Sequence, residues 1–346
     1  MDWWCGCLKP FLQFFERGRS TFVPSTIQVG DMHLVALSTI GEGAYSKVLK
    51  CRDPFTDTLY AVKTMNVGTL DAQKNADREI TILKSVRDHR NVVHMYDAGK
   101  STSGTPSATT SPVAYIATEY CEGSLIHEMM EAKATKHFLP LETHVLRAVS
   151  DMVHALAYLH SRPQPISHRD LKPENILCQD GIYKLCDFGS ATTQRYECST
   201  AAQIALAEEE FSKVYTLQYR APETLDLWKK HPVDERVDVW ALGVMTYYLC
   251  FLTMPFEESS LSILQGRYTF PPYTTNCTRE LEGLIRKMLV VDPRDRPTIF
   301  AVSHMLHEIY RSHEVIPPPS SDRSPTVVSS SSLRSPRSRN LLMAPT

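Results

Sequence analysis

The chain has 346 residues and a formal net charge of −2, so it is long enough to bury a large core in more than one lobe. The near-neutral charge gives the whole protein no bias toward nucleic acid or anionic membranes, and we expect no nucleic acid partner. The nine cysteines, an odd number without CxxC pairs, indicate reduced thiols, and no secretory signal is visible, so we expect a cytoplasmic protein.

The first half of the chain is predicted to be rich in strands. Alternating and β-branched runs between Gly and Pro turns are typical of strands, whereas apolar residues at helical spacing indicate one helix. Residues 100–112 are rich in Ser, Thr, Gly and Pro, which predicts a mobile loop. The expected strands are residues 33–40, 46–52, 59–65, 92–96 and 114–118, and the expected helix is residues 71–85.

The second half is predicted to be mainly helical, because its apolar residues recur at helical spacing. A strand-rich first part followed by a helix-rich second part predicts two lobes of one α+β unit, residues 29–119 and 120–314. Residues 1–28 should form a separate segment, and residues 315–346, rich in Ser, Pro and Arg, should be disordered. The expected helices are residues 144–160, 201–213, 280–289 and 298–310.

Two polar motifs in the second half carry the clearest chemical signal. The run HRDLKPEN at residues 168–175 is followed by DFG at residues 187–189. Together they place two carboxylates, an ammonium and a carboxamide on closely spaced loops, which is the set that phosphoryl transfer needs. The pair resembles the catalytic loop and the metal-binding motif of eukaryotic protein kinases. The alternative interpretation, an ordinary loop with scattered charge, would require the whole run to match this motif by chance.

This resemblance implies a bilobal protein kinase fold over residues 29–314, with a small β-rich lobe containing one key helix and a larger helical lobe. It further implies that Asp170 orients the substrate hydroxyl and takes its proton late, and that Lys172 stabilises the transferred phosphoryl group. Asn175 and Asp187 would bind two magnesium ions that bridge the phosphates of ATP. The presence of Lys172 within this run resembles the serine/threonine subclass of these enzymes.

The segment at residues 41–48 resembles the glycine-rich loop that covers the nucleotide phosphates in protein kinases, with Ser46 in place of the third glycine. It lies between two predicted strands, and its glycines would let backbone amides approach the phosphates closely. Lys63, on the next strand, is expected to bind the α- and β-phosphates and to pair with Glu79. The implied loop positions are Gly41, Glu42, Gly43, Ala44, Tyr45, Ser46 and Val48.

The adenine site of protein kinases has two further parts that this chain matches. Three apolar positions would sandwich the ring, although each alone would also suit an ordinary core. A hinge at residues 118–121 (TEYC) would bind the edge of the ring through one backbone carbonyl and one backbone amide. Its small threonine predicts an open pocket behind the adenine. The positions are Val48, Ala61 and Leu177 for the sandwich, and Thr118, Glu119 (carbonyl) and Cys121 (amide) for the hinge.

Other positions match residues that build the site in active protein kinases. Thr216 matches the threonine that bonds the catalytic Asp and Lys, and Asp238 matches the aspartate that anchors the catalytic loop. Glu223 would pair with Arg296 as a buried structural bridge. A stacked apolar column that joins the two lobes, which would equally suit a plain core, matches Leu83, Met95, His168 and Phe188.

Residues 239–256 resemble a membrane-spanning segment, since they are almost wholly apolar and about as long as a transmembrane helix. We reject that interpretation because the run contains Gly243 and Pro255, and because a helix that is apolar all round equally suits the buried centre of a large domain. The protein kinase resemblance places the central buried helix of the larger lobe at this point.

Among protein kinases, the chain is similar to the Numb-associated kinase family, which has an extra helix in its activation segment. Residues 201–213 fit such a helix, which would order the segment without phosphorylation. The alternative is a phosphate on Thr200 or Ser212 that pairs with Arg169. The motifs that carry this resemblance are residues 186–192 (CDFGSAT), 208–211 (EEEF), 215–220 (YTLQYR) and 249–256 (LCFLTMPF).

The resemblance implies ATP and magnesium as cofactors, serine and threonine in proteins as acceptors, endocytic adaptor subunits among the substrates, and a role in membrane trafficking. We expect a monomer. A catalytically weak kinase-fold scaffold at membranes is the main rival, and it would be expected to lack one of four key residues. A nucleotide-binding metabolic enzyme of another fold would need a different phosphate-binding loop, GxxxxGKS or GxxxxGKT, which the sequence lacks. The four key residues, all present, are Lys63, Asp170, Asn175 and Asp187.

The N-terminal segment suggests peripheral contact with a membrane through residues 1–19. Aromatic residues lie beside basic residues and two cysteines there, and S-acylation of Cys5 or Cys7 would strengthen the attachment. Asp2 excludes N-myristoylation. The alternatives are that the aromatic residues pack on the kinase body, or that the two cysteines bind zinc, for which no second pair lies nearby. The aromatic residues are Trp3, Trp4, Phe11, Phe14 and Phe15.

Overall fold

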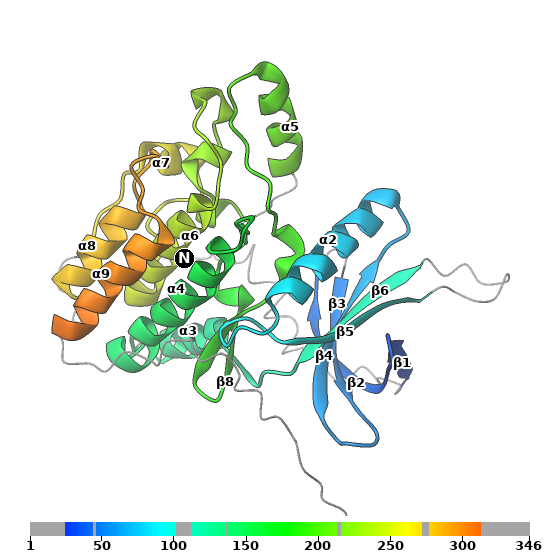
Figure 1. Ribbon diagram of the computed structural model, residues 1–346. Coiled ribbons are helices and arrows are strands. Elements are labelled where there is room, and N and C mark those ends of the chain that lie inside the picture. Colours follow the sequence, from blue (N-terminus) through cyan, green and yellow to red (C-terminus); the bar gives the residue numbers. More distant parts are fainter. Residues whose placement is uncertain are drawn as a thin grey trace, which may run out of the picture.

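The computed structural model describes residues 25–43, 46–101, 112–135, 137–212, 216–271 and 277–312. A six-stranded antiparallel sheet with one long helix forms the first part, and a mainly helical second part carries a small three-stranded sheet (Figure 1). This arrangement confirms the predicted two-lobed α+β fold. Most of the predicted N-terminal segment, the loop residues 102–111 and the C-terminal tail lie outside the described residues.

The first lobe is built on the large sheet, whose strand order is β1-β2-β3-β4-β6-β5. Neighbouring residues of one strand point to opposite faces, so Ile116 joins the core beneath helix α2 while Ala117 joins a smaller apolar cluster on the other face. Thr69 caps α2 by accepting a hydrogen bond from the Ala72 amide at 3.2 Å. The elements are β1 (Thr26–Val29), β2 (Met32–Glu42), β3 (Ser46–Arg52), β4 (Leu59–Asn66), α2 (Leu70–Val86), β5 (Met95–Ser101) and β6 (Val113–Glu119).

Two sequence predictions for this lobe differ from the structure. The predicted domain boundary between residues 28 and 29 falls inside strand β1, which pairs with β2 over its whole length. The strand predicted at residues 92–96 is wrong, because strand β5 runs over Met95–Ser101. Val92 and Val93 are buried in the core ahead of β5, where Val92 makes only an isolated bridge to Leu185.

The second lobe is organised around helix α6, whose side chains are buried on nearly every side. Helices α4 and α8 pack against it, and α9 packs against α4 and α8 (Figure 1). Each helix in the described part of the chain is too short or too polar to span a bilayer. The elements are β7 (Gly123–Ser124), α3 (Leu125–Ala134), a π-helical turn (Leu141–Leu146), α4 (Arg147–His160), β8 (Ile176–Gln179), β9 (Ile182–Leu185), α5 (Ala201–Phe211), α6 (Arg236–Phe251), α7 (Ser260–Gln265), α8 (Arg279–Met288) and α9 (Ile299–Ser312).

Gly243 lies where α6 meets the end of α8. A Cβ atom at this position would lie 2.9 Å from side-chain atoms of both Met288 and Leu289. Carbon atoms do not approach that closely without repulsion. Gly243→Ala should therefore lower the free energy of unfolding by about 1–3 kcal/mol, because overpacking outweighs the higher helix propensity of alanine.

Gly283→Ala is the matched control for that substitution. Gly283 lies within α8, and a Cβ atom there would meet no other atom within 4 Å. The control should raise the free energy of unfolding by about 0.5–1 kcal/mol, because alanine restricts the unfolded chain. Urea unfolding of the two variants and the unsubstituted protein measures both changes. Equal stabilities of the two alanine variants would contradict the close packing at Gly243.

Candidate active site

The glycine-rich segment forms the hairpin between β2 and β3. Gly41 pairs with Val48 and Glu42 with Lys47, and the Gly43 amide donates a hydrogen bond to the Ser46 carbonyl at 2.8 Å. Neither glycine adopts a positive φ. A Cβ atom at either glycine would come no closer than 3.4 Å to its neighbours, so the turn itself does not require glycine; the glycines instead leave a backbone that a phosphate could approach closely. Ala44 and Tyr45, predicted at its tip, lie outside the described residues.

Lys63 joins the two lobes through two carboxylates. Its Nζ atom lies 2.6 Å from Glu79 Oε1 on helix α2 and 2.7 Å from Asp187 Oδ1 in the DFG motif. Glu79 itself is buried. The ion pair predicted between Lys63 and Glu79 is present, and Asp187 is a second partner of the same ammonium. The strand, the helix and the DFG motif are thus held together at one point.

Charge pairing controls the protonation of Lys63 and Asp187. Burial lowers the pKa of Lys63, but the nearby carboxylates of Asp187 and Glu79 outweigh that effect and hold the pKa above its ordinary value. Burial raises the pKa of Asp187, yet Lys63 outweighs it and lowers the pKa to about 2. Lys63 and Asp187 therefore remain charged throughout the neutral pH range, as phosphate and cation binding require.

The catalytic-loop motif is anchored to helix α6 by Asp238. This fully buried carboxylate accepts hydrogen bonds from the backbone amides of His168 and Arg169, each at 2.8 Å, and lies 3.0 Å from His160 Nε2. Arg169 has a φ of 66°, a strained left-handed conformation for a residue with a side chain. The charged hydrogen bonds to Asp238 stabilise that strained backbone and thereby orient Asp170.

Asp170 lies at the centre of a compact polar network. The Lys172 ammonium is 2.9 Å from Asp170 Oδ2 and 3.0 Å from the Thr216 hydroxyl. The Asn175 amide nitrogen donates to the Asp170 carbonyl at 2.8 Å and to Asp170 Oδ2 at 2.9 Å. Thr216 was predicted to contact both the Asp and the Lys, and the structure brings it to Lys172. Lys172 and Asn175 thus contact the Asp170 carboxylate directly, and Thr216, from a separate segment, contacts Lys172.

The two predicted magnesium ligands have suitable donor atoms. Asn175 uses its amide nitrogen on Asp170, which leaves its amide oxygen as the atom able to bind a cation. Asp187 is ionised and its side chain remains 45% exposed. Carboxylate and amide oxygens are ligands that magnesium accepts, with water and phosphate completing its coordination. The residues present therefore fit the ion.

The predicted adenine residues come from both lobes. Ala61 on β4 pairs with Thr118 on β6, whose hydroxyl donates to the Ala61 carbonyl at 3.3 Å. The Glu119 carboxylate accepts from the His94 amide at 2.7 Å and pairs with Lys184 at 2.9 Å, contacts that the sequence did not predict. These contacts hold the hinge in place. Each predicted adenine residue is half-buried, namely Val48, Ala61, Thr118, Glu119, Cys121 and Leu177.

The predicted column between the lobes consists of buried side chains. The rings of His168 and Phe188 meet edge to face, with centroids 5.0 Å apart, and His168 Nε2 lies 3.1 Å from the Cys186 carbonyl. Leu83 from α2 and Met95 from β5 belong to the same apolar core. The placement of α2 is thereby coupled through packing to the DFG motif, next to the residue that pairs with Lys63.

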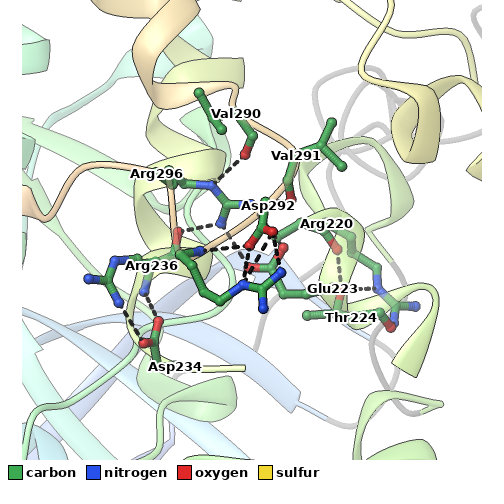
Figure 2. A network of polar contacts seen from close by, with 11 residues as sticks. Arg220, Glu223, Thr224, Asp234, Arg236, Val290, Val291, Asp292 and Arg296 are labelled. Atoms are coloured by element: carbon green, nitrogen blue, oxygen red, sulfur yellow. Dashed lines mark hydrogen bonds and ion pairs between the residues drawn. The ribbon is translucent and has the colours of Figure 1, made fainter. Parts of the chain in front are cut away.

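Glu223 and Arg296 form the predicted buried bridge beneath the activation segment (Figure 2). Their two parallel contacts are 2.7 and 2.9 Å long, and both side chains have no exposed surface. Arg296 also donates to three backbone carbonyls, so all five of its N–H groups have partners. The carbonyls belong to Arg236, Val290 and Val291.

Known proteins are similar to most of this chain. Residues 34–310 match the family described as the protein kinase domain. Two proteins of Dictyostelium discoideum, each named a probable serine/threonine-protein kinase, are 36% identical over 84% of this chain and 32% identical over 83% of it. Actin-regulating kinase 1 of Saccharomyces cerevisiae is 31% identical over 74% of this chain. The chain spans only 26%, 35% and 40% of the lengths of these three relatives.

Proposed function

The chain belongs to the protein kinase family, and on that premise we propose that it transfers the γ-phosphoryl group of ATP to serine and threonine hydroxyls of proteins. The observation that carries the proposal is the Lys172 ammonium, 2.9 Å from the Asp170 carboxylate and 3.0 Å from the Thr216 hydroxyl. An ammonium beside a carboxylate is the arrangement needed where a phosphoryl group passes to a hydroxyl.

The residues divide the chemistry between them. Asp170 accepts a hydrogen bond from the acceptor hydroxyl, aims its oxygen at the γ-phosphorus and takes the proton late, as the new O–P bond forms and the bond to the leaving ADP oxygen breaks. Lys172 stabilises the charge on the transferred group. Lys63, held by Glu79, binds the α- and β-phosphates. Bound magnesium would supply neutralisation of the phosphate charge.

The proposal is tested with labelled ATP, magnesium and three peptide pools that differ only in a Ser, Thr or Tyr acceptor. Label should appear in the Ser and Thr pools, because Lys172 and Thr216 match the serine/threonine subclass, and a magnesium chelator should abolish it. Asp170→Asn serves as the inactive control. Equal, background labelling by the unsubstituted protein and by this control would instead favour the catalytically weak scaffold.

Within the family, we propose a Numb-associated type of kinase that acts as a monomer in membrane trafficking, with endocytic adaptor subunits as substrates. Two features support this proposal. The sequence motifs at residues 186–192 and 249–256 resemble that group, and helix α5 occupies the activation segment, where that group has an extra helix. Recombinant adaptor subunits added to the peptide assay test it, and labelling no faster than that of an unrelated protein would contradict it.

We also propose that the chain is cytoplasmic and attaches peripherally to a membrane through S-acylation of Cys5 and Cys7. Both cysteines lie in the N-terminal segment with its aromatic and basic residues, and two acyl chains are what stable attachment requires. The variant with both cysteines changed to serine should move from the membrane to the soluble fraction of the cell. Unchanged membrane association would exclude acylation as its cause.

A further inference from the structure

The carboxylate of Glu119, in the hinge between the lobes, contacts both lobes at once. Its Oε1 atom accepts a hydrogen bond from the His94 amide at 2.7 Å and lies 2.9 Å from the Lys184 ammonium. The Glu119 side chain is 19% exposed and that of Lys184 is 13% exposed, so solvent screens this ion pair less than a pair on the open surface. The hinge is thus held near its start by a partly buried charged contact.

His94 fixes Glu119 to the first lobe. The Glu119 amide donates to the His94 carbonyl at 2.9 Å, in addition to the contact between the His94 amide and the Glu119 carboxylate. The His94 ring is itself held, because Nδ1 lies 3.0 Å from the carbonyl of Arg87, the C-terminal cap of helix α2, and the ring meets that of Tyr96 edge to face. The first lobe therefore determines where the carboxylate lies.

Lys184 connects this carboxylate to the second-lobe member of the predicted adenine sandwich. It lies on β9 directly opposite Leu177 of β8. Directly opposed residues of antiparallel strands point to the same face of a sheet. The ammonium that pairs with Glu119 and the apolar side chain expected against the adenine ring thus belong to one pair of strands, and their positions are coupled.

The two ends of the hinge are held to the second lobe in different ways. At its end, backbone pairing of β7 with β8 places Ser124 opposite Leu177, and no charge is involved. At its start, by contrast, the ion pair between the Glu119 and Lys184 side chains makes the contact with the second lobe. The position of the Glu119 carbonyl relative to Leu177 therefore depends on that ion pair.

We propose that the Glu119 side chain is a positioning residue for the adenine ring of ATP. The Glu119 carbonyl is expected to bind the edge of the ring, and its carboxylate, through Lys184, fixes the distance between that carbonyl and Leu177. A site whose parts are already in place loses less entropy when its ligand binds. The ion pair therefore strengthens ATP binding without taking part in phosphoryl transfer. The inference rests on the proposed kinase function and deepens it at the nucleotide.

Glu119→Gln in the full-length protein removes the charge but can still accept the hydrogen bond from the His94 amide. It should raise the Kd and the KM for ATP about tenfold. The kcat should change less than about twofold, because an interaction made equally in the ground state and the transition state affects KM alone. Lys184→Met should behave alike, and the double variant should lose no more than either single variant. Calorimetric titration measures Kd, and steady-state peptide labelling measures KM and kcat.

Tripolyphosphate with magnesium separates the positioning of adenine from a general loosening of the site. This ligand lacks the adenine ring, and its phosphates would bind at Lys63, whose partners Glu79 and Asp187 remain in place. Its Kd should be the same for Glu119→Gln and the unsubstituted protein. Glu131→Gln, which removes the same charge from an exposed position of α3, is the matched control and should bind ATP and tripolyphosphate unchanged.

Two outcomes would overturn the inference. The first is Glu119→Gln with the same Kd for ATP as Glu131→Gln, and the second is Glu119→Gln that loses affinity for ATP and for tripolyphosphate to the same extent. In either case the unsubstituted protein still labels peptides, so the proposed function stands. A protein that shows the expected Kd changes but labels no peptide would refute the proposed function and leave the inference about nucleotide binding intact.

Discussion

Asp170→Asn should lower kcat about a thousandfold or more and leave the Kd for ATP within about twofold of its original value. The asparagine cannot take the proton of the acceptor hydroxyl, and it lacks the negative charge that pairs with the Lys172 ammonium, which lies 2.9 Å from the carboxylate in the unsubstituted protein. ATP binding depends instead on Lys63 and its carboxylate partners, which this substitution does not touch. Steady-state phosphate transfer measures kcat, and calorimetric titration with ATP measures Kd.

Asp180→Asn is the control for this substitution. Asp180 is exposed in the turn between β8 and β9 with a φ of 53°, a conformation that asparagine adopts readily. The same chemical change at this position should leave kcat unaltered. If Asp170→Asn kept a kcat within tenfold of that of Asp180→Asn, the role assigned to Asp170 would be wrong.

Arg296→Met should lower the free energy of unfolding by about 3–5 kcal/mol, because it leaves the buried Glu223 charge without a partner. Methionine keeps much of the apolar bulk, so the loss reports mainly the missing charge and the hydrogen bonds to the carbonyls around it (Figure 2). Urea unfolding followed by intrinsic fluorescence measures the change. Glu223→Leu in the same chain should recover part of it, since no unpaired charge then remains.

Arg294→Met provides the comparison for Arg296. Arg294 lies two residues away and pairs with Asp292, but its side chain is 63% exposed. Exposed ion pairs contribute little to stability because water and salt screen them. The midpoint of the Arg294→Met variant should therefore stay close to that of the unsubstituted protein. Equal stabilities of the two methionine variants would show that the buried bridge contributes no more than a surface pair.

Much of the first lobe follows from local sequence patterns, and its errors have physical causes. Strand β3 begins and ends where alternation predicted, at Ser46 and Arg52. Strand β5 was misplaced because Asp97, Gly99 and Lys100 resemble a loop, but an edge strand tolerates polar residues on its open side. Strand β1 was missed because its four residues form a sheet only by pairing with β2.

In the candidate site, too, local sequence patterns predicted the motif residues but not the contacts between distant segments. The motifs specified Lys63, Asp170 and Asp187 because their chemistry depends on residue type and spacing. Arg169 pairs with Glu210, which lies 41 positions away in sequence, and this ion pair depends on how helix α5 packs. Hydrophobic periodicity describes a single helix or strand and not its contacts with other elements. It therefore predicted helix α5 but not which of its glutamates would face Arg169.

The claim that this site performs phosphoryl transfer is tested most directly by one measurement on purified full-length protein. Labelled ATP, magnesium and the Ser, Thr and Tyr peptide pools are incubated with the unsubstituted protein and, separately, with Asp170→Asn. We predict label in the Ser and Thr pools with the unsubstituted protein and background label with the variant. Equal labelling of the Ser and Thr pools by the two proteins would contradict the claim.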